Sequence, residues 1–350
     1  MKATSEILRL TFRDPFVIAR ARPNEGPTTV IVTLDDGDGA TGVGEGFPDR
    51  FYGETPETVV WVVPELVATA TEAGPMPGDL DAMRAWLVAA SQAMDERISH
   101  NGAAKCAVDI ALHDLAGKRL GVSLVDLLGT PHALPPTDFT VGLDEPAVMA
   151  ERAARAAHFP ALKIKVGGPA DVATLEAVRA VFDGPIRIDA NTAWTPEIAE
   201  AMLPECLRLG VQLIEQPFPA RRLDQLRWLQ ERSPLPVVAD ESAVVEADLD
   251  GLVGVVAGVN VKLAKVGGVG PALRMIRRAR ELGFRIFLGC MEETSLGIAA
   301  SAAVAGLVDW VDLDGCLLLA DDPFEGLVLG ADSRWQLPVV PGVGVVRRRS

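Results

Sequence analysis

Short apolar runs rich in valine and isoleucine alternate, from residue 139 onward, with longer stretches whose apolar residues recur at helical spacing. Brief apolar runs indicate buried strands, and apolar residues three or four apart indicate helices. Strands that alternate with helices pair in parallel through right-handed crossovers, so the pattern predicts a doubly wound sheet or a closed barrel. The predicted strands cover residues 139–142, 161–166, 186–189, 211–215, 237–240, 259–262, 285–288 and 310–313.

The chain before this region has a different pattern. A β-branched run at 28–34 precedes a turn with Gly37, and 41–45 is the predicted return strand of a hairpin. Residues 56–98 and 103–119 have helical spacing. We therefore predict an α+β domain ahead of the alternating region.

The end of the chain is irregular after Leu319 and becomes strand-like again at 335–346, which we expect to pair with the N-terminal sheet. The predicted organisation has three parts: an α+β capping domain at 1–128, a (β/α) barrel at 129–319, and a C-terminal segment at 320–350 that returns to the cap.

Charged residues stand at the carboxyl ends of the predicted strands, 22 to 26 residues apart along most of the chain. One such residue per unit suits a ring of functional groups around a barrel mouth. A doubly wound sheet would instead gather them at a single switch point. The pattern therefore favours a modified TIM-type (β/α) barrel. The residues concerned are Lys163, Lys165, Asp189, Glu215, Asp240, Lys262, Asp312 and Asp314.

Asp189, Glu215 and Asp240 end three consecutive strands. Carboxylates that converge in a partly desolvated mouth repel one another, so a positive charge must compensate them. A hard divalent cation with oxygen ligands does so, and Mg²⁺ is the best candidate in the absence of nearby histidine or cysteine, with Mn²⁺ as an alternative. The alternative interpretation is that the three acids only cap helices or line loops.

Lysines flank these acids on both sides. Lys163 and Lys165 share one face of a strand, while Ile164 points to the other face. Lys262 lies four strands further along, across the barrel from Lys165. Buried lysines are costly unless they have a partner or a function, although a lysine pair at a surface strand end is the simpler alternative. We expect Lys265, beyond the strand end, to lie in a loop or at the surface.

Two lysines on opposite sides of a metal indicate removal of a proton from one face of a carbon atom and its return to the other. A proton α to a carboxylate is weakly acidic, and a cation that binds the carboxylate stabilises the enediolate formed when it leaves. The base must be neutral near pH 7, so we expect its pKa to lie well below the usual value of about 10.4 for lysine.

The composition excludes several other classes of protein. The net charge of −15 disfavours nucleic acid as a partner, and no apolar run is long enough to span a membrane. The N-terminus lacks the features of a signal peptide, and the four cysteines are scattered without a CxxC pair. We therefore expect a cytoplasmic protein, which could form a homo-oligomer.

The motifs around these residues resemble those of the enolase superfamily, muconate-lactonizing-enzyme subgroup, over nearly the whole chain. The matching segments are LKIKVGG at 162–168, IDANTAW at 188–194, IEQPFP at 214–219, ADES at 239–242, NVKLAKVGG at 260–268 and the helical segment 103–129. The resemblance implies a modified barrel closed by a capping domain, with lysine bases and Mg²⁺.

The resemblance also implies a role for each matching residue. Asp189, Glu215 and Asp240 correspond to the Mg²⁺ ligands, and Asn191 and Glu241 to neighbours of the metal. By the same resemblance Lys165 and Lys262 are the two acid/base lysines, and Lys163 supports the first of them.

Asp312 and Asp314 resemble the DxD motif of dipeptide epimerases within this superfamily. A dipeptide whose carboxylate binds Mg²⁺ carries an ammonium group at its other end, which two carboxylates on one strand face would bind. The resemblance therefore implies an isomerase that inverts the C-terminal residue of a dipeptide.

Two N-terminal loops, 17–26 and 46–54, resemble those of L-Ala-D/L-Glu epimerases and are expected to set specificity. Their arginines could bind a glutamate side chain, and an acid in the seventh-strand segment could instead favour a cationic residue. Because neighbouring strand residues point to opposite faces, we expect only one of Glu292 and Glu293 to line the pocket. The candidate substrate contacts are Arg20, Arg22, Arg50, Tyr52, Met291, Glu292 and Glu293.

L-Ala-D/L-Glu is the first substrate expected, and a cationic or hydrophobic dipeptide the second. An N-acylamino-acid racemase or o-succinylbenzoate synthase of the same superfamily is an alternative that would not need an ammonium contact. A non-catalytic metal-binding or solute-binding protein is the remaining alternative, and it would bind Mg²⁺ without exchanging an α-proton.

Overall fold

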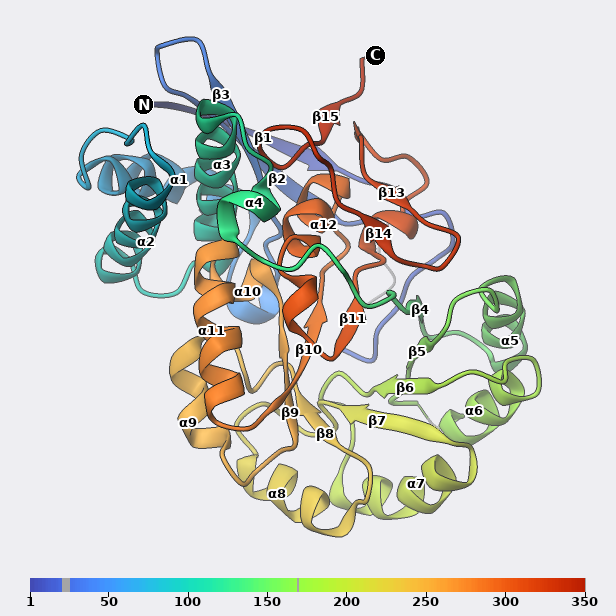
Figure 1. The fold of residues 1–350 in the computed structure, drawn as a ribbon. Helices are drawn as coiled ribbons and strands as arrows, with labels where there is room; N and C mark the ends of the chain where they lie inside the picture. The colour runs from blue at the N-terminus through green and yellow to red at the C-terminus, as the bar shows by residue number, and fades with distance from the viewer. Residues whose placement is uncertain (21–25, 169, 350) are drawn as a thin grey trace.

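A computed structural model describes residues 1–20, 26–168 and 170–349. The chain begins with an antiparallel sheet in the order β1 (Lys2–Arg9), β2 (Thr28–Asp35), β3 (Thr41–Gly46). Four helices follow it (Figure 1). They are α1 (Pro56–Thr71), α2 (Leu80–Arg97), α3 (Gly102–Leu120) and α4 (Leu124–Leu128). Helices α1 and α3 pack against this sheet, while α2 and α4 pack against the other helices.

Glycines at alternate positions of β3 allow helix α3 to lie directly against this strand. A Cβ atom at Gly42, Gly44 or Gly46 would come within 2.1 Å of a main-chain carbonyl oxygen of α3. Alternate strand residues share one face, so the three glycines form a continuous flat surface for the helix. The predicted hairpin and helices of this region are confirmed, and the glycine spacing explains how they pack.

Eight parallel strands form the second sheet, in the order β11-β10-β9-β8-β7-β6-β5-β4. Their bounds are β4 (Phe139–Val141), β5 (Leu162–Lys165), β6 (Ile186–Asp189), β7 (Val211–Glu215), β8 (Val237–Ala239), β9 (Gly258–Val261), β10 (Arg285–Gly289) and β11 (Trp310–Asp312). A bridge between Thr137 and Val311 brings the first and last strands together, so the sheet closes into a near-barrel. The predicted strands and the barrel class are confirmed.

Helices surround the barrel on its outer side (Figure 1). They are α5 (Pro146–Arg155), α6 (Asp171–Arg179), α7 (Pro196–Arg208), α8 (Leu223–Arg232), α9 (Leu249–Leu252), α10 (Leu263–Val266), α11 (Val269–Glu281) and α12 (Ser295–Ala302). Among them, the short α10 lies against α3 of the cap. One apolar core runs through both the barrel and the N-terminal helices and sheet. Among the described helices, none has the length and apolar character needed to cross a membrane.

The C-terminal strands pair with one another, so the expected pairing with the N-terminal sheet is wrong. Two short hairpins form instead, from β12 (Phe324–Glu325) with β15 (Val346–Arg347) and from β13 (Val328–Leu329) with β14 (Trp335–Gln336). The segment still reaches the N-terminal helices, because the main-chain N–H of Val343 donates to the Asp114 carboxylate at 2.9 Å. Gly342 adds main-chain hydrogen bonds with Val122 and Leu124, and Arg347 forms an ion pair with Glu6 of β1, so the segment contacts the cap without adding a strand to its sheet.

Candidate active site

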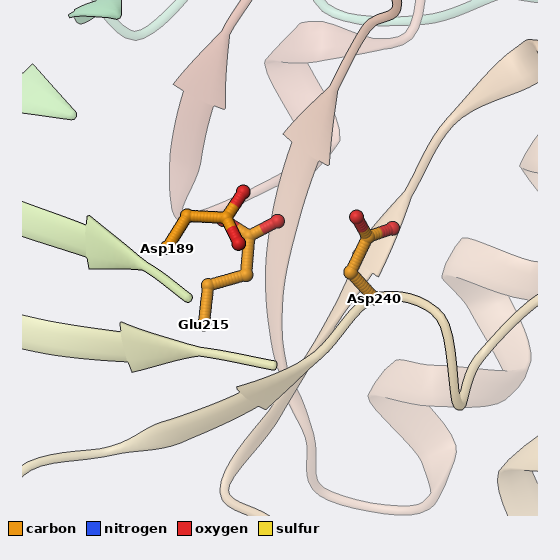
Figure 2. Close-up of side chains that lie close together, drawn as sticks. All are labelled: Asp189, Glu215 and Asp240. Carbon is orange, nitrogen blue, oxygen red and sulfur yellow. The ribbon is translucent and has the colours of Figure 1, made fainter. Parts of the chain in front are cut away.

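Asp189, Glu215 and Asp240 lie together at the carboxyl ends of β6, β7 and β8 (Figure 2). Each offers a carboxylate oxygen within 4.8 Å of the other two, and all three side chains are buried. Parallel pairing aligns Asp189 with Glu215, after a register shift between Ile186 and Arg187, and both residues end their strands at the same edge of the sheet. The donor set is made only of oxygen atoms, which suits a hard cation such as Mg²⁺.

Lysines lie on both flanks of the three carboxylates. Lys165, on β5, donates to Asp189 Oδ2 at 2.7 Å, and Lys262, directly after β9, donates to Asp240 Oδ2 at 2.8 Å. The strand order therefore places one lysine beyond each end of the row of three acids. Lys163 lies beneath this row, 2.9 Å from Glu215 Oε2 and 3.2 Å from Asp189 Oδ2.

The lysines keep the outer acids ionised. Burial on its own would raise the pKa of Asp189, but Lys165 and Lys163 outweigh it and lower the pKa to about 2. Burial acts in the same direction on Asp240, and Lys262 and Lys265 hold its pKa well below the ordinary range. Both carboxylates are therefore charged near neutral pH and available to a cation.

The acids act on the lysines in return. Burial on its own would lower the pKa of Lys262, but the Asp240 carboxylate outweighs it and raises the pKa. Burial is likewise outweighed at Lys163, where Asp312 and Glu215 raise the pKa well above the ordinary value. At Lys262 and Lys163 the neighbouring acids therefore act against the lowered pKa that we expected for a base.

Lys265 is buried, so the expectation of a loop or surface position is wrong. Its ammonium group contacts Asp240 Oδ1 at 2.5 Å and the carbonyl oxygens of Asp240, Ala243 and Asn260 at 2.8, 3.1 and 2.9 Å. The short helix α10, which carries this lysine, directs the side chain back toward the barrel. Asp240 is thus held by a lysine on each of its two oxygens.

Polar side chains near the acids fix their orientation. Asn191 donates from its main-chain N–H to Asp189 Oδ1 at 2.9 Å and from its side chain to Glu241 Oε1 at 3.3 Å. Sequence reasoning missed two further residues of this kind. Asn260 donates to Glu215 Oε1 at 2.7 Å, and the side chain of Gln216 accepts the N–H of Asp240 at 2.9 Å.

Asp312 and Asp314 lie close together, but not on one strand face, because β11 ends at Asp312. Asp312 Oδ2 accepts from Lys163 at 2.9 Å, and its Oδ1 accepts from the Thr140 hydroxyl at 3.0 Å. Asp314 accepts the main-chain N–H of Thr140 at 2.6 Å. Burial would raise the pKa of Asp312, yet Lys163 lowers it, whereas burial and the neighbouring Asp312 raise the pKa of Asp314.

The N-terminal loops bring Arg20 and Tyr52 over the barrel mouth. The Arg20 guanidinium donates to Glu241 and lies 4.4 Å from the centre of the Phe51 ring. The Tyr52 hydroxyl is buried and has no hydrogen-bond partner among the described residues. Burial, with Asp240 and Glu241 nearby, raises the pKa of Tyr52.

The structure separates the remaining loop arginines from this group. Arg50 is exposed in a short 3-10 turn, and among the described residues no ion pair joins it to the barrel mouth. Arg22 lies outside the described residues. Arg20 is therefore the arginine of the set that the structure places against the site.

The seventh-strand segment is a loop at the relevant positions, because β10 ends at Gly289. The expected alternation of Glu292 and Glu293 on a strand is therefore wrong. Glu292 and Met291 are partly exposed, whereas Glu293 is buried, and the Met291 N–H lies 3.4 Å from Glu293 Oε2. Burial and the nearby Glu45 raise the pKa of Glu293 to about 8.

Fold and site together define a class of protein: a parallel α/β barrel under an α+β cap, with an oxygen-ligand site for a divalent cation between two lysines. The family comparison agrees with this class. Residues 3–129 match the mandelate racemase / muconate lactonizing enzyme N-terminal domain, and residues 147–349 match the enolase C-terminal domain-like family. The chain belongs to this enolase-type family, as the sequence motifs predicted.

Individual relatives match over almost the full length. The L-Ala-D/L-Glu epimerase of Bacteroides thetaiotaomicron is 35% identical over 99% of this chain and 88% of its own. The crystal structure of a dipeptide epimerase from Enterococcus faecalis, complexed with Mg and L-Leu-L-Tyr, is 32% identical with a TM-score of 0.85 and covers 98% of each chain. An enolase family member from Agrobacterium tumefaciens, with homology to dipeptide epimerases, has bound sodium and L-Ala-L-Glu. It is 35% identical, has a TM-score of 0.85 and covers 98% of this chain and 99% of its own.

Proposed function

We propose that this protein is a Mg²⁺-dependent dipeptide epimerase, an isomerase that inverts the α-carbon of the C-terminal residue. The observation that carries the proposal is the placement of Lys165 and Lys262 at opposite ends of one row of three metal-binding acids. The relatives named above support the class of substrate. Mn²⁺, which shares the preference for oxygen ligands, is the alternative cation.

The proposed roles of the residues follow from this geometry. Asp189, Glu215 and Asp240 hold the cation, which when bound supplies positive charge to the acids and to a substrate carboxylate. One lysine, as the neutral amine, takes the α-proton from one face and becomes an ammonium group. The lysine on the other side, as the ammonium, returns a proton to the opposite face.

Ion pairs with four lysines balance the charge of the acids; these are Lys163, Lys165, Lys262 and Lys265. Because Asp240 raises the pKa of Lys262, any positive charge that engages Asp240 favours the neutral amine. Lys163 lies between Glu215 and Asp312, and we assign it a supporting role.

Asp312 and Asp314 support a substrate with an ammonium group rather than an N-acyl group. Both carboxylates are buried beside the lysine that contacts the metal-binding acids. An N-acylamino acid or a succinylbenzoate precursor would place neutral or anionic groups there, which is unfavourable. The racemase and synthase alternatives therefore fit these two residues less well.

Within dipeptides we propose L-Ala-D/L-Glu as the first substrate, because Arg20 lies over the mouth and already binds a carboxylate, that of Glu241. A glutamate side chain would find the same charge-assisted partner. The partly exposed Glu292 and Met291 favour a cationic or hydrophobic second residue as the alternative. Tyr52 is proposed as part of the pocket wall.

Proton NMR in D₂O with Mg²⁺ tests the proposal on L-Ala-L-Glu, L-Ala-L-Lys, L-Ala-L-Phe and L-Ala-L-Leu. We expect the C-terminal α-proton signal to disappear for one of these dipeptides. Lys165→Ala and Lys262→Ala should each abolish exchange or restrict it to one epimer, whereas Lys118→Ala, on helix α3 of the cap, should leave it unchanged. No loss of signal across the panel, with exchange of N-succinyl amino acids instead, would refute the dipeptide assignment.

We further propose that residues 1–128 and 320–350 form the cap and 129–319 the catalytic barrel. The hydrogen bonds between Val343 and Asp114 and between Leu124 and Gly342 support this division. A cytoplasmic location is proposed because all four cysteines are free, as in a reducing compartment. A homo-oligomer is compatible with this assignment.

A further inference from the structure

Thr140 lies between the two carboxylates assigned above to a substrate ammonium group. Its hydroxyl donates to Asp312 Oδ1 at 3.0 Å, and its main-chain N–H donates to Asp314 Oδ2 at 2.6 Å. All three residues are buried. One residue therefore contacts both acids, through two different groups.

Barrel closure creates this arrangement. Thr140 belongs to β4, the first barrel strand, whereas Asp312 ends β11, the last one, 172 residues later. The two strands meet at the seam, where the N–H of Asp138 donates to the carbonyl of Val311 at 3.0 Å. Asp314 lies beyond the end of β11, so strand alternation does not set its position. The hydrogen bond from the Thr140 main-chain N–H holds its carboxylate in place.

The contacts also fix which oxygen of Asp312 faces which partner. Lys163 Nζ donates to Oδ2 at 2.9 Å, and the Thr140 hydroxyl donates to Oδ1. Thr140 and Lys163 are aligned partners on neighbouring strands, so both donors come from one level of the barrel. With both oxygens engaged, the Asp312 carboxylate has a single orientation.

We propose that Thr140 is a positioning residue for substrate recognition, which holds Asp312 and Asp314 in the geometry that binds the ammonium group of a dipeptide. This inference rests on the proposed dipeptide epimerase function. It assigns no proton transfer to Thr140. It predicts that the hydroxyl group affects binding of the amino end of the substrate and leaves proton transfer at the α-carbon unchanged.

Thr140→Val removes the hydroxyl at nearly constant volume and retains the main-chain N–H, so it isolates one of the two contacts. Thr140→Ser retains both contacts and is the matched control. A hydrogen bond to a charged group contributes enough that its loss should raise KM for L-Ala-L-Glu about tenfold. The value of kcat should stay within about twofold, because the variant retains both acid/base lysines and all three metal-binding acids.

N-Propionyl-L-glutamate separates positioning from a general structural effect, because it is L-Ala-L-Glu without the ammonium group. Its inhibition constant against the wild-type protein and the valine variant should be the same, while KM for L-Ala-L-Glu rises. The serine variant should behave as the wild type. If the valine variant does not fold, as judged by its thermal unfolding, Thr140→Ala takes its place.

Two results would overturn the inference while leaving the function intact. In one, KM and the inhibition constant rise by the same factor in the valine variant. In the other, neither constant changes. If the wild-type protein exchanges the α-proton of none of the panel dipeptides, the proposed function itself fails, and the inference fails with it.

Discussion

Replacing Lys265 by methionine measures what the fold gains from a lysine that the sequence suggested was peripheral. Its ammonium group contacts one oxygen of Asp240 at 2.5 Å and the carbonyl oxygens of Asp240, Ala243 and Asn260. Methionine retains a four-atom unbranched apolar stem but removes the terminal ammonium group, with its charge and its donors. The substitution therefore leaves buried acceptors without this partner and creates little empty space.

The magnitude follows from the partners that remain. Removal of one member of a buried ion pair costs about 3–5 kcal/mol. Asp240 keeps Lys262 at 2.8 Å through its other oxygen, and its carbonyl keeps the N–H of Ala243 at 3.0 Å. We therefore expect a loss of about 3 kcal/mol, near the lower end of that range. Such a loss is a large share of the roughly 5–15 kcal/mol that stabilises a typical domain.

Urea unfolding followed by tryptophan fluorescence, in buffer with a chelator, is the assay, so that no metal contributes to the result. Lys105→Met is the matched control, because Lys105 is also buried but pairs at 2.8 Å with Asp95, whose side chain is 41% exposed. Exposed partners contribute little, and we expect this variant to lose about 1 kcal/mol or less. Equal losses in the two variants would refute the argument that the buried contacts of Asp240 are the cause.

Three further predictions concern the metal site, the cap and the pH dependence of stability. Millimolar Mg²⁺ should raise the unfolding temperature of the wild-type protein, because a ligand that binds only the folded state stabilises it, and a persistent rise in Asp189→Asn would argue against the metal site. Gly44→Ala should lower the free energy of unfolding in urea by about 1–3 kcal/mol, because its Cβ would lie 2.1 Å from a carbonyl oxygen of α3. Gly78→Ala is the control and should cost far less, because a Cβ there meets no atom within 4 Å. Similar losses in the two variants would contradict the packing argument. Burial raises the pKa of Glu54 from its ordinary 4.5 to about 7, so the folded chain binds the extra proton between these values and loses stability as pH rises through them. Glu54→Gln should remove up to about 3 kcal/mol of this dependence, measured as the free energy of unfolding at about pH 5 and about pH 8, and an unchanged pH profile would exclude Glu54 as its source.

The sequence by itself determined the barrel fold and the row of acidic and basic residues at the carboxyl ends of its strands. Alternation of strands and helices leaves parallel pairing with right-handed crossovers as the stable arrangement, and it places the carboxyl ends of all strands on one side. Asp189 and Glu215 end two consecutive strands and Asp240 directly follows the third. On either side, Lys165 ends its strand and Lys262 directly follows its own. That these acids and lysines lie next to one another could be predicted, because it follows from the order of the strands in the sheet.

The tertiary structure decided the positions that depend on side-chain direction beyond the strand ends. Lys265 lies in the short helix α10 that follows β9, and this helix directs the ammonium group toward Asp240. The loop after β10 does not alternate, so the burial of Glu293 beside the cap could not be inferred from its spacing. In such segments the backbone follows no fixed period, and the direction of each side chain is set by what packs against it.

The same reason applies to contacts between distant parts of the chain. Thr140 meets Asp312 and Asp314 only because the first and last strands close the barrel, and no local pattern signals that partnership. The C-terminal strands pair with each other and not with an edge strand of the N-terminal sheet. Strand propensity does not decide between these pairings, because it depends on what packs around each strand. Sequence periodicity determines which elements form and how they follow one another, whereas packing across the closed barrel and under the cap determines which side chains meet.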